Sequence, residues 1–391
     1  MSGNADVLIV GCGLCGGLIA RKIAERGFKV CIIEKRDHIA GNMYDEFLDD
    51  GNYLQRYGPH SFHTNNKVLF EEIKPFSQWD EFRLTCKAVV QEQELPSPFN
   101  FAAVDLLYDR STASKLKNEL FQAFPQRELV TILELLSSPI KIIREYAELL
   151  FEEDYRPYTA KQWGIQPEQI APSVLQRVPI RLSYKDGYFD DVYQYMPRNG
   201  FTSLFMSLLD HPNIELILNQ DATRLIGIDL QEKMLTVNGG PWSKPIVYTG
   251  AIDGLFHYKY GKLPYRSLRF EYQTHSVVSF QSAPVIAYPK AEGFTRITEY
   301  NKFLPHVNRL STVIAHEYPL PFNPQNGNKL EPYYPVLTEE SNLIYNRYLK
   351  ASNMFKNLFL CGRLADYKYY NMDNAIERAL EVLRKIEESC L

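Results

Sequence analysis

The first stretch of the chain alternates between apolar runs and small residues in a pattern typical of a strand, a glycine turn, a helix and a second strand. Asp6–Val10 is a short β-rich run, and residues 11–17 read GCGLCGG. A helical stretch follows through Glu25, with a stop at Gly27, and Val30–Ile33 form a second apolar run that is followed by Glu34. Strands on both sides of the glycines, with an acidic residue after the second strand, predict a dinucleotide-binding βαβ unit.

Each glycine of this unit has a physical task. Gly11 permits the tight turn, Gly13 lets the backbone approach a pyrophosphate, and Gly16 allows the helix to pack against the strand. The helix N-terminus supplies free N–H groups and the positive end of a dipole. Glu34 is suited to accept hydrogen bonds from ribose hydroxyls, which disfavours a 2′-phosphorylated cofactor and leaves FAD or NAD.

The segments that follow favour FAD. Residues 35–42 (KRDHIAGN) form a polar loop with a glycine, as in FAD proteins of the glutathione-reductase type, whereas NAD enzymes usually continue into another βα repeat. Near the other end, residues 357–363 predict a strand that breaks at Gly-Arg, and residues 374–388 carry apolar side chains at helical spacing. Chain ends that meet around one cofactor predict a discontinuous FAD-binding domain.

The middle of the chain shows two other patterns. Residues from about 101 to 165 predict helices, whereas residues 178–193 and 276–318 alternate apolar and polar positions, as in an antiparallel sheet. We therefore expect an α/β fold in which a discontinuous Rossmann-like FAD-binding domain carries a helical insert and an antiparallel β-sheet domain. The expected ranges are 1–75, 198–245 and 350–391 for the FAD-binding domain, 101–165 for the helical substrate-side domain, and 76–100, 166–197 and 246–349 for the sheet domain.

Composition excludes several classes of protein. A net charge of -4 and a pI near 6.1 provide no basic field for a nucleic-acid backbone. No apolar stretch reaches the ~20 residues of a membrane span, and the first residues lack a signal peptide, so we expect a cytoplasmic protein. The six cysteines are spaced neither as a disulfide framework nor as a zinc site, so we expect reduced thiols and no metal.

A series of motifs from residue 7 to about 380 follows the order seen in one family. The most specific are residues 57–65 (YGPHSFHTN), 158–164 (YTAKQWG), 177–181 (RVPIR), 248–253 (YTGAID), 295–297 (TRI), 317–320 (EYPL), 331–336 (EPYYPV) and 362–370 (GRLADYKYY). The sequence thereby resembles the bacterial, FAD-dependent UDP-galactopyranose mutases over nearly its whole length.

The resemblance implies an isomerase that interconverts UDP-galactopyranose and UDP-galactofuranose, or a close nucleotide-linked hexose, without net oxidation. In that family reduced FAD is the active form, and its N5 forms an adduct with the sugar. The implied partner is a UDP-hexose, the context is cell-surface polysaccharide biosynthesis, and a homodimer is one option. Three alternatives stay open: an FAD oxidoreductase of the amine-oxidase type, a mutase for dTDP-fucose or UDP-N-acetylgalactosamine, and a non-catalytic nucleotide-sugar binder.

The resemblance also assigns site residues. Arg181 and Arg296 are expected to donate to the departing diphosphate, and His60, the third member of the catalytic set, is expected beside the flavin. The expected substrate contacts are Tyr158, Trp163, Tyr193, Tyr334, Tyr369 and Asn371. The expected cofactor contacts are Gly11, Gly13, Gly16, Glu34, Lys35, Asn42, His60 and Arg363.

The chain departs from the family pattern near the expected substrate pocket. Asn371 stands where the family has a carboxylate, Asp154 lies where aromatic residues are usual, and Val192 replaces a basic residue. Leu84 falls near a position that is often asparagine. The type of chemistry is therefore better determined by the sequence than the identity of the sugar or the base.

Overall fold

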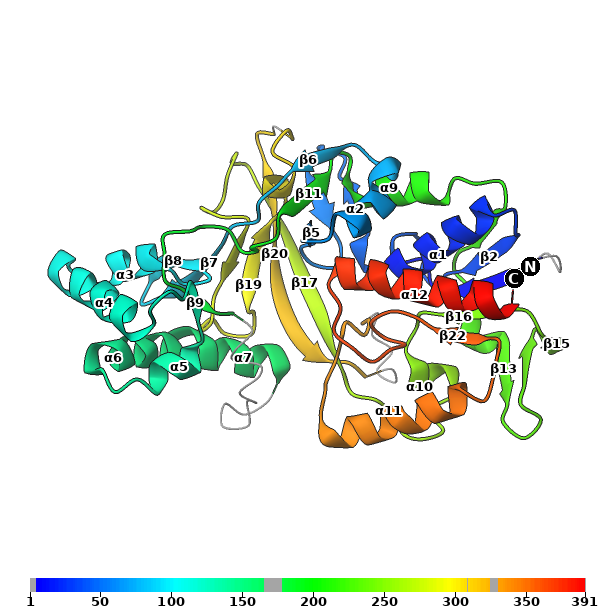
Figure 1. Cartoon of the computed structure of the whole chain (residues 1–391). Coiled ribbons are helices and arrows are strands. Elements are labelled where there is room, and N and C mark those ends of the chain that lie inside the picture. Colours follow the sequence, from blue (N-terminus) through cyan, green and yellow to red (C-terminus); the bar gives the residue numbers. More distant parts are fainter. Residues whose placement is uncertain (1–4, 165–177, 308, 324–329, 391) are drawn as a thin grey trace.

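The computed structural model describes residues 5–164, 178–307, 309–323 and 330–390. Arg177 and some residues of the expected domains lie outside these ranges. The molecule is elongated (Figure 1). A parallel sheet with both termini lies at one end, a group of helices lies at the other, and long antiparallel strands run between them. This arrangement confirms the expected Rossmann-like α/β fold with a helical insert and an antiparallel sheet.

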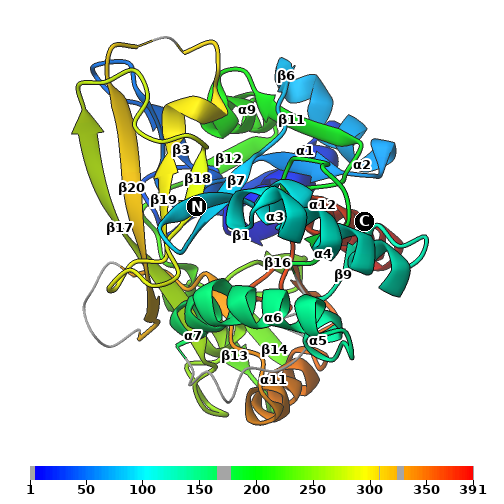
Figure 2. The same ribbon diagram turned by 90° about the vertical axis from the view of Figure 1, so that its left-hand side faces the viewer.

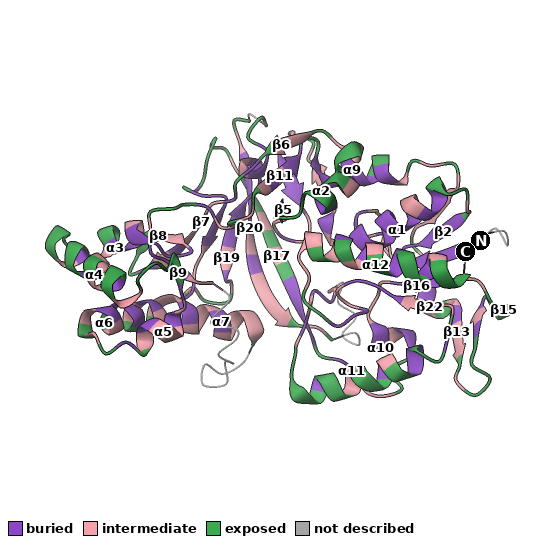
Figure 3. Ribbon diagram, viewed as in Figure 1, coloured by how far each residue is buried: buried purple, intermediate pink, exposed green. Residues whose placement is uncertain are grey.

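The parallel sheet contains five strands in the described part of the chain. Their order across the sheet is β12 (Ile214–Ile217), β2 (Val30–Ile33), β1 (Val7–Val10), β16 (Ile246–Tyr248) and β22 (Leu358–Leu360). Every residue of β1, β2 and β16 is buried, because helices or further strands cover both faces of the sheet. Figure 3 shows this buried interior beside helices whose outer faces are exposed.

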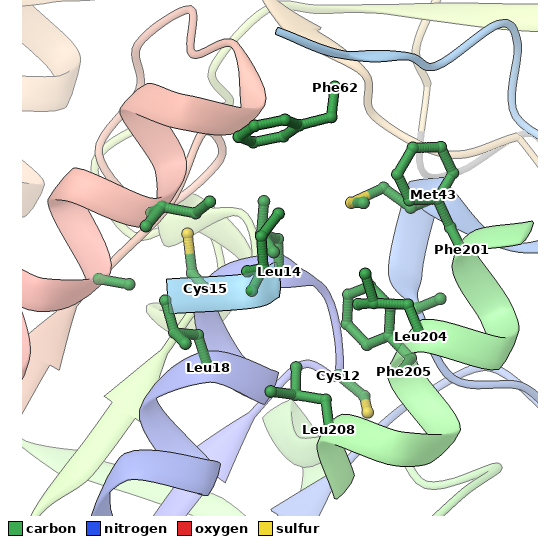
Figure 4. Packing of buried hydrophobic residues seen from close by; sticks show 14 of the residues in the cluster. Cys12, Leu14, Cys15, Leu18, Met43, Phe62, Phe201, Leu204, Phe205 and Leu208 are labelled. Atoms are coloured by element: carbon green, nitrogen blue, oxygen red, sulfur yellow. The ribbon is translucent and has the colours of Figure 1, made fainter. Parts of the chain in front are cut away.

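Two apolar layers hold the parallel sheet. Odd-numbered residues of β1 face the layer that contains α1 (Leu14–Glu25), α9 (Gly200–Leu209) and α12 (Met372–Cys390). Figure 4 shows this packing, with Leu14 and Leu18 of α1 close to Leu204, Phe205 and Leu208 of α9. The opposite layer is formed by α10 (Ile252–Leu255), α11 (Glu339–Ser352), and the antiparallel strands β13 (Ile226–Asp229), β14 (Met234–Val237) and β15 (Gly240–Trp242).

The strand β16 shifts one expected domain boundary. It lies at the start of the range 246–349, which was expected to belong to the antiparallel domain, yet it pairs in parallel with both β1 and β22. Its three residues, Ile-Val-Tyr, are all buried, as a strand in the middle of a covered sheet requires. The helix α11, near the end of the same range, likewise packs against the parallel sheet.

The central sheet contains seven strands in the described residues. Their order is β21 (Tyr334–Pro335), β17 (Tyr265–His275), β20 (Thr312–Pro321), β19 (Arg296–Glu299), β18 (Val285–Ala287), β7 (Cys86–Val90) and β8 (Gln93–Ser97). All neighbours are antiparallel except β18 and β7. The sequence 178–193, where strands of this sheet were expected, contains only β10 (Ile180–Arg181) and the start of β11 (Tyr193–Pro197), each in a small sheet of its own.

The helical end has a separate apolar core. Figure 2 looks at this end of the molecule, where α3 (Phe101–Leu107) and α4 (Arg110–Ala123) lie above α5 (Ile132–Leu136), α6 (Lys141–Leu150) and α7 (Arg156–Trp163). Three side chains cap these helices, and each such cap stabilises a helix by about 1 kcal/mol. The caps are Asn100 for α3, Asp109 for α4 and Thr131, within a capping box, for α5.

Shorter elements complete the structure. They are the strands β3 (Asp45–Phe47), β4 (Tyr53–Gln55), β5 (Phe62–Thr64), β6 (Trp79–Glu81) and β9 (Leu129–Val130) and the helix α2 (Lys67–Ile73). Within the described ranges, no helix is both long and apolar enough to cross a membrane. The six cysteines are free thiols, and five of them are buried.

Candidate functional site

Two glycines of the turn after β1 leave no room for a side chain. A Cβ atom at Gly11, where φ is +97°, would lie 2.0 Å from Thr249 Oγ1, and one at Gly16 would lie 2.0 Å from the Gly11 carbonyl oxygen. Gly41, with φ of +57°, would place a Cβ 2.9 Å from the Cα of Gly13. Three backbone segments therefore approach one another closely at the N-terminus of α1, as a pyrophosphate-binding turn requires.

Glu34 lies at the end of β2, beside this turn. Its buried carboxylate accepts hydrogen bonds from the backbone N–H of Cys12 at 2.8 Å and of Arg36 at 3.0 Å. The carboxylate is thus held at the glycine turn, where a ribose is expected. The other two expected cofactor contacts near this turn, Lys35 and Asn42, have different environments. Lys35 is exposed and forms an ion pair with Glu331, whereas Asn42 accepts a hydrogen bond from Arg36 Nη2 at 2.8 Å.

Arg36 was not among the expected cofactor contacts, although the structure places it at this turn. Its guanidinium stacks over the Tyr57 ring at 4.3 Å and donates to Asn42. Among the described residues, its Nε and Nη1 atoms are buried without a hydrogen-bond acceptor. Arg36 lies in the bend that follows β2, outside the strand, so the alternation of a strand could not identify it from the sequence.

A second group of polar residues surrounds Arg296, at the start of β19. In the register of the central sheet Arg296 lies opposite Glu317 of β20. Arg296 Nε donates to a Glu317 oxygen at 2.9 Å, and Nη2 forms an ion pair with the same oxygen at 2.7 Å. Burial opposes the charge on Arg296, but Glu317 and the nearby Tyr158 and Tyr334 outweigh it and hold the pKa of Arg296 above its usual range.

Glu317 was part of a sequence motif but had no assigned role. The structure shows that it is 1% exposed and that it fixes the Arg296 guanidinium. Within the described chain, its second oxygen is buried without a donor. The pairing of Arg296 with Glu317 depends on the register of two strands joined by a long loop, so no local sequence signal identified it.

His60 lies close to this group. Its Nδ1 is 2.9 Å from the Gly58 carbonyl oxygen. Burial lowers the pKa of His60 to about 4; the hydrogen bond to Gly58 opposes this, and the positive charges of Arg363 and Arg296 add to it. His60 is therefore neutral at physiological pH, with Nδ1 donating to Gly58 and Nε2 carrying a lone pair. His63, by contrast, pairs with Asp191 at 2.8 Å and stacks on Phe189.

The C-terminal strand brings Arg363 into the same region. Its guanidinium lies over the rings of Tyr334 and Tyr369, at 5.0 and 5.1 Å from their centroids, and those rings stack 5.7 Å apart. The pKa of Tyr334 is raised by burial first and then by Tyr369, while Arg363 and Arg296 oppose the rise. We refer to Tyr158, Arg296, Glu317, Tyr334, Arg363, Tyr369 and His60 as the arginine-tyrosine site.

Arg181 is held by a different set of partners. Its side chain is 3% exposed, and Nη2 pairs with Asp190 at 3.1 Å. Nη1 donates to the carbonyl groups of Lys185 and Asp186, and Nε is buried without an acceptor among the described residues. The structure thus fixes Arg181 against the loop that follows β10, and to reach a diphosphate it would have to exchange Asp190 for the phosphate.

The remaining expected substrate contacts occupy separate elements. Trp163 is the last residue of α7 and is half-buried, and Asn371 immediately precedes α12, where its backbone N–H donates to Asn374. Tyr193 lies on β11, opposite Thr64, and its ring stacks on Phe70. Tyr193 thus contacts β5 and the helix α2.

Of the positions that depart from the family pattern, Asp154 has the most unusual environment. It lies in a π-helical turn over Phe151–Tyr155, immediately before α7. Burial raises the pKa of Asp154 to about 7. The pKa of Tyr158 is raised by burial first, Arg296 opposes this rise, and the charges of Glu317 and Asp154 add to it. Val192, in contrast, is 71% exposed, and Leu84 is buried.

The chain was compared with known families, proteins and structures. The family described as UDP-galactopyranose mutase matches residues 154–369, and that described as NAD(P)-binding Rossmann-like domain matches residues 9–74. The chain is 36% identical to a UDP-galactopyranose mutase of Mycoplasma pneumoniae over 380 residues, covering 96% of this chain and 94% of that protein. It is 33% identical to a dTDP-fucopyranose mutase of Escherichia coli, covering 96% of each. The fold resembles that of a reduced UDP-galactopyranose mutase with a TM-score of 0.74 at 16% identity, covering 98% of this chain and 94% of the other.

Proposed function

The chain belongs to the UDP-galactopyranose mutase family, whose members are isomerases, and we propose that it interconverts the pyranose and furanose forms of UDP-galactose. The observation that carries this proposal is the arginine-tyrosine site. A guanidinium fixed by a buried carboxylate lies among tyrosine side chains, beside a neutral histidine. That arrangement suits a diphosphate whose negative charge increases as it leaves.

We propose that FAD binds at the glycine turn. The lack of space for a side chain at Gly11 and Gly16 and the close approach of Gly41 to Gly13 fit a turn that binds a pyrophosphate, and the buried Glu34 carboxylate fits a ribose. Arg36 Nε and Nη1, which are buried without an acceptor in the described part of the chain, fit a further polar group of the cofactor. When bound and reduced, the flavin supplies a nucleophilic nitrogen for a sugar rearrangement that involves no net oxidation.

Arg296 is proposed to bind the diphosphate. An arginine has five N–H donors, and Glu317 accepts from Nε and pairs with Nη2, which holds the plane of the guanidinium. Nη1 has no hydrogen-bond acceptor among the described residues, so it can bind anionic oxygens, with charge-assisted hydrogen bonds that strengthen as the leaving group gains charge. Arg363 adds a second positive charge at the same site.

Tyrosine hydroxyl groups are proposed to complete the diphosphate site. Burial raises the pKa of Tyr158 and of Tyr334, so both stay protonated and both can donate hydrogen bonds at neutral pH. Tyr369 is 41% exposed and lies at the outer side of the site, stacked on Tyr334. The ring of Tyr158 also offers a flat face on which a pyrimidine can stack.

His60 is proposed to act as a hydrogen-bond acceptor beside the reacting groups. Because Nδ1–H donates to Gly58, the lone pair of Nε2 is available for an N–H or O–H group of the cofactor or the substrate. Arg181 is proposed to join the diphosphate by exchanging its Asp190 partner for phosphate, since Asp190 is 42% exposed and can be solvated. A cytoplasmic location fits a nucleotide-sugar substrate.

One other substrate is supported by specific observations. A dTDP-fucopyranose mutase is nearly as similar in sequence as the UDP-galactopyranose mutases, and Asn371 replaces a carboxylate near the expected sugar. An amide can donate as well as accept, so the exchange can alter which sugar hydroxyl is bound. Conversion of UDP-galactofuranose by the reduced protein tests the proposal, and failure to convert either this sugar or dTDP-fucofuranose contradicts it.

A further inference from the structure

Lys161, in the last turn of α7, has no role in the proposed chemistry, yet all of its N–H donors have partners. Its Nζ donates to the carbonyl oxygens of Tyr288, Ala291 and Phe294, at 2.9, 2.8 and 2.7 Å. An ammonium group has three N–H donors, so this group of carbonyls satisfies it completely. We call Lys161 with these three carbonyls the carbonyl clamp.

The clamped loop leads directly to Arg296. Residues 288–295 connect β18 to β19, and Arg296 is the first residue of β19. Thr295 is fully buried, and its backbone N–H donates to the Glu317 carbonyl at 2.9 Å, so the end of the loop is fixed to β20. The carbonyl clamp therefore joins α7, which carries Tyr158 and Trp163, to the turn that presents Arg296.

Arg266, on the strand β17, also contacts this end of α7. Arg266 of β17 donates to the Gln162 carbonyl at 3.0 Å and to the Lys161 carbonyl at 3.2 Å, which are among the last carbonyls of the helix. Gly164 ends the helix with φ of +65°, and a Cβ there would lie 2.4 Å from Arg266 Nη1. The direction of α7 is thus determined by contacts to the strand β17 and to the loop between β18 and β19.

We propose that Lys161 is a positioning residue that sets the distance between Tyr158 and Arg296 and thereby determines the affinity for the nucleotide part of the substrate. This inference rests on the proposed function. Tyr158 lies one helical turn before Lys161, and its side chain interacts electrostatically with Arg296 and Glu317. Release of the clamp frees α7 from the turn before Arg296, so a base stacked on Tyr158 and a diphosphate on Arg296 are no longer held in register.

Lys290 provides a matched control within the same loop. Its ammonium group pairs with Glu153 of the π-helical turn at 2.5 Å, so it also links the loop to the segment before α7. However, the Lys290 side chain is 57% exposed, and exposed ion pairs contribute little to the stability of the folded protein. Removing Lys290 therefore changes the loop and its charge without affecting the carbonyl clamp.

The test compares Lys161→Met with Lys290→Met in the FAD-loaded protein. UDP binding is measured by calorimetry, and KM and kcat are measured with UDP-galactofuranose. We expect Lys161→Met to weaken UDP binding and raise KM by about tenfold or more, with kcat within about threefold, because binding and not the chemical step loses its geometry. Lys290→Met should remain within about twofold of the wild type in each quantity.

Four outcomes distinguish the clamp from a merely structural role. If Lys161→Met fails to fold, Lys161→Gln replaces it, since its amide NH2 keeps part of the clamp, and a smaller shift of KM in the same direction supports the proposal. Wild-type affinity for UDP in the folded Lys161 variant overturns it. An equal loss in Lys290→Met also overturns it. If the wild type itself binds no UDP, the proposed function fails, and the inference fails with it.

Discussion

Arg296 on β19 and Glu317 on β20 lie opposite each other, and one oxygen of a carboxylate that is 1% exposed accepts a hydrogen bond from Nε and forms an ion pair with Nη2. A buried carboxylate that fixes the plane of an arginine leaves the other N–H groups of that arginine with defined directions. The pair therefore prepares Arg296 to bind a diphosphate before the substrate arrives.

Replacing Arg296 by alanine should reduce turnover by about two to four orders of magnitude, because a preorganised donor to developing charge is lost. The FAD content should not change. Steady-state kinetics and the absorbance of bound flavin measure the two effects. Arg269→Ala is the control, since Arg269 is a largely exposed arginine of β17 that pairs with Glu271. Loss of FAD or unfolding of Arg296→Ala would show that Arg296 is structural.

Glu317→Gln keeps the size of the side chain but removes the charge that fixes Arg296. We expect turnover to fall by about tenfold to a hundredfold, less than for the loss of the guanidinium itself. Glu271→Gln is the control, because this glutamate of the adjacent strand is exposed. Unchanged turnover of Glu317→Gln would contradict the assigned role of the buried carboxylate.

Gly16→Ala tests the glycine turn. The new Cβ would lie 2.0 Å from the Gly11 carbonyl oxygen, so the turn must open and the pyrophosphate site must distort. The purified variant should carry little or no flavin, as measured by its absorbance. Gly254→Ala is the matched control, because no atom lies within 4 Å of the Cβ position in that helix. Equal flavin content in both variants would place the cofactor elsewhere.

The pKa of Asp154, raised by burial from 3.8 to about 7, predicts a pH dependence of stability. Between these two values the folded state holds the proton that the unfolded state releases, so the contribution of Asp154 becomes less favourable as pH rises through about 7. Asp154→Asn removes this dependence. Urea unfolding at pH 6 and pH 8 should show that the wild type loses stability relative to Asp154→Asn. A constant difference between the two proteins would contradict the raised pKa.

Local patterns in the sequence predicted the N-terminal unit well. The strand Val30–Ile33 was predicted with the bounds that the structure shows, and the helix before it ends at Glu25, close to the predicted stop at Gly27. Glycine spacing and short apolar runs determine such a unit locally. The place of β16 was not predictable in this way, because a run of three apolar residues gains its parallel partners from strands more than a hundred residues away.

The sequence predicted only part of the candidate site, because several of its contacts also depend on long-range pairing. The motifs identified Arg296, but its partner Glu317 depends on strand register, and Arg36 depends on which side chain of a polar loop turns inward. The local burial of Arg181, with its ion pair to Asp190, depends on the path of the loop after β10. Roles assigned by resemblance to Tyr193 and Asn371 remain predictions.

The most direct test of the proposed function compares three substrates with dithionite-reduced, FAD-loaded protein. UDP-galactofuranose, dTDP-fucofuranose and UDP-N-acetylgalactofuranose are each converted under identical conditions, and the pyranose products are separated by chromatography. We predict conversion of UDP-galactofuranose with the highest kcat/KM, without stoichiometric consumption of reductant and only with reduced protein. A preference of more than about tenfold for another substrate would revise the proposed sugar but leave the proposed type of reaction unchanged. Equal rates with oxidised and reduced protein, or no conversion of any of the three, would contradict the account.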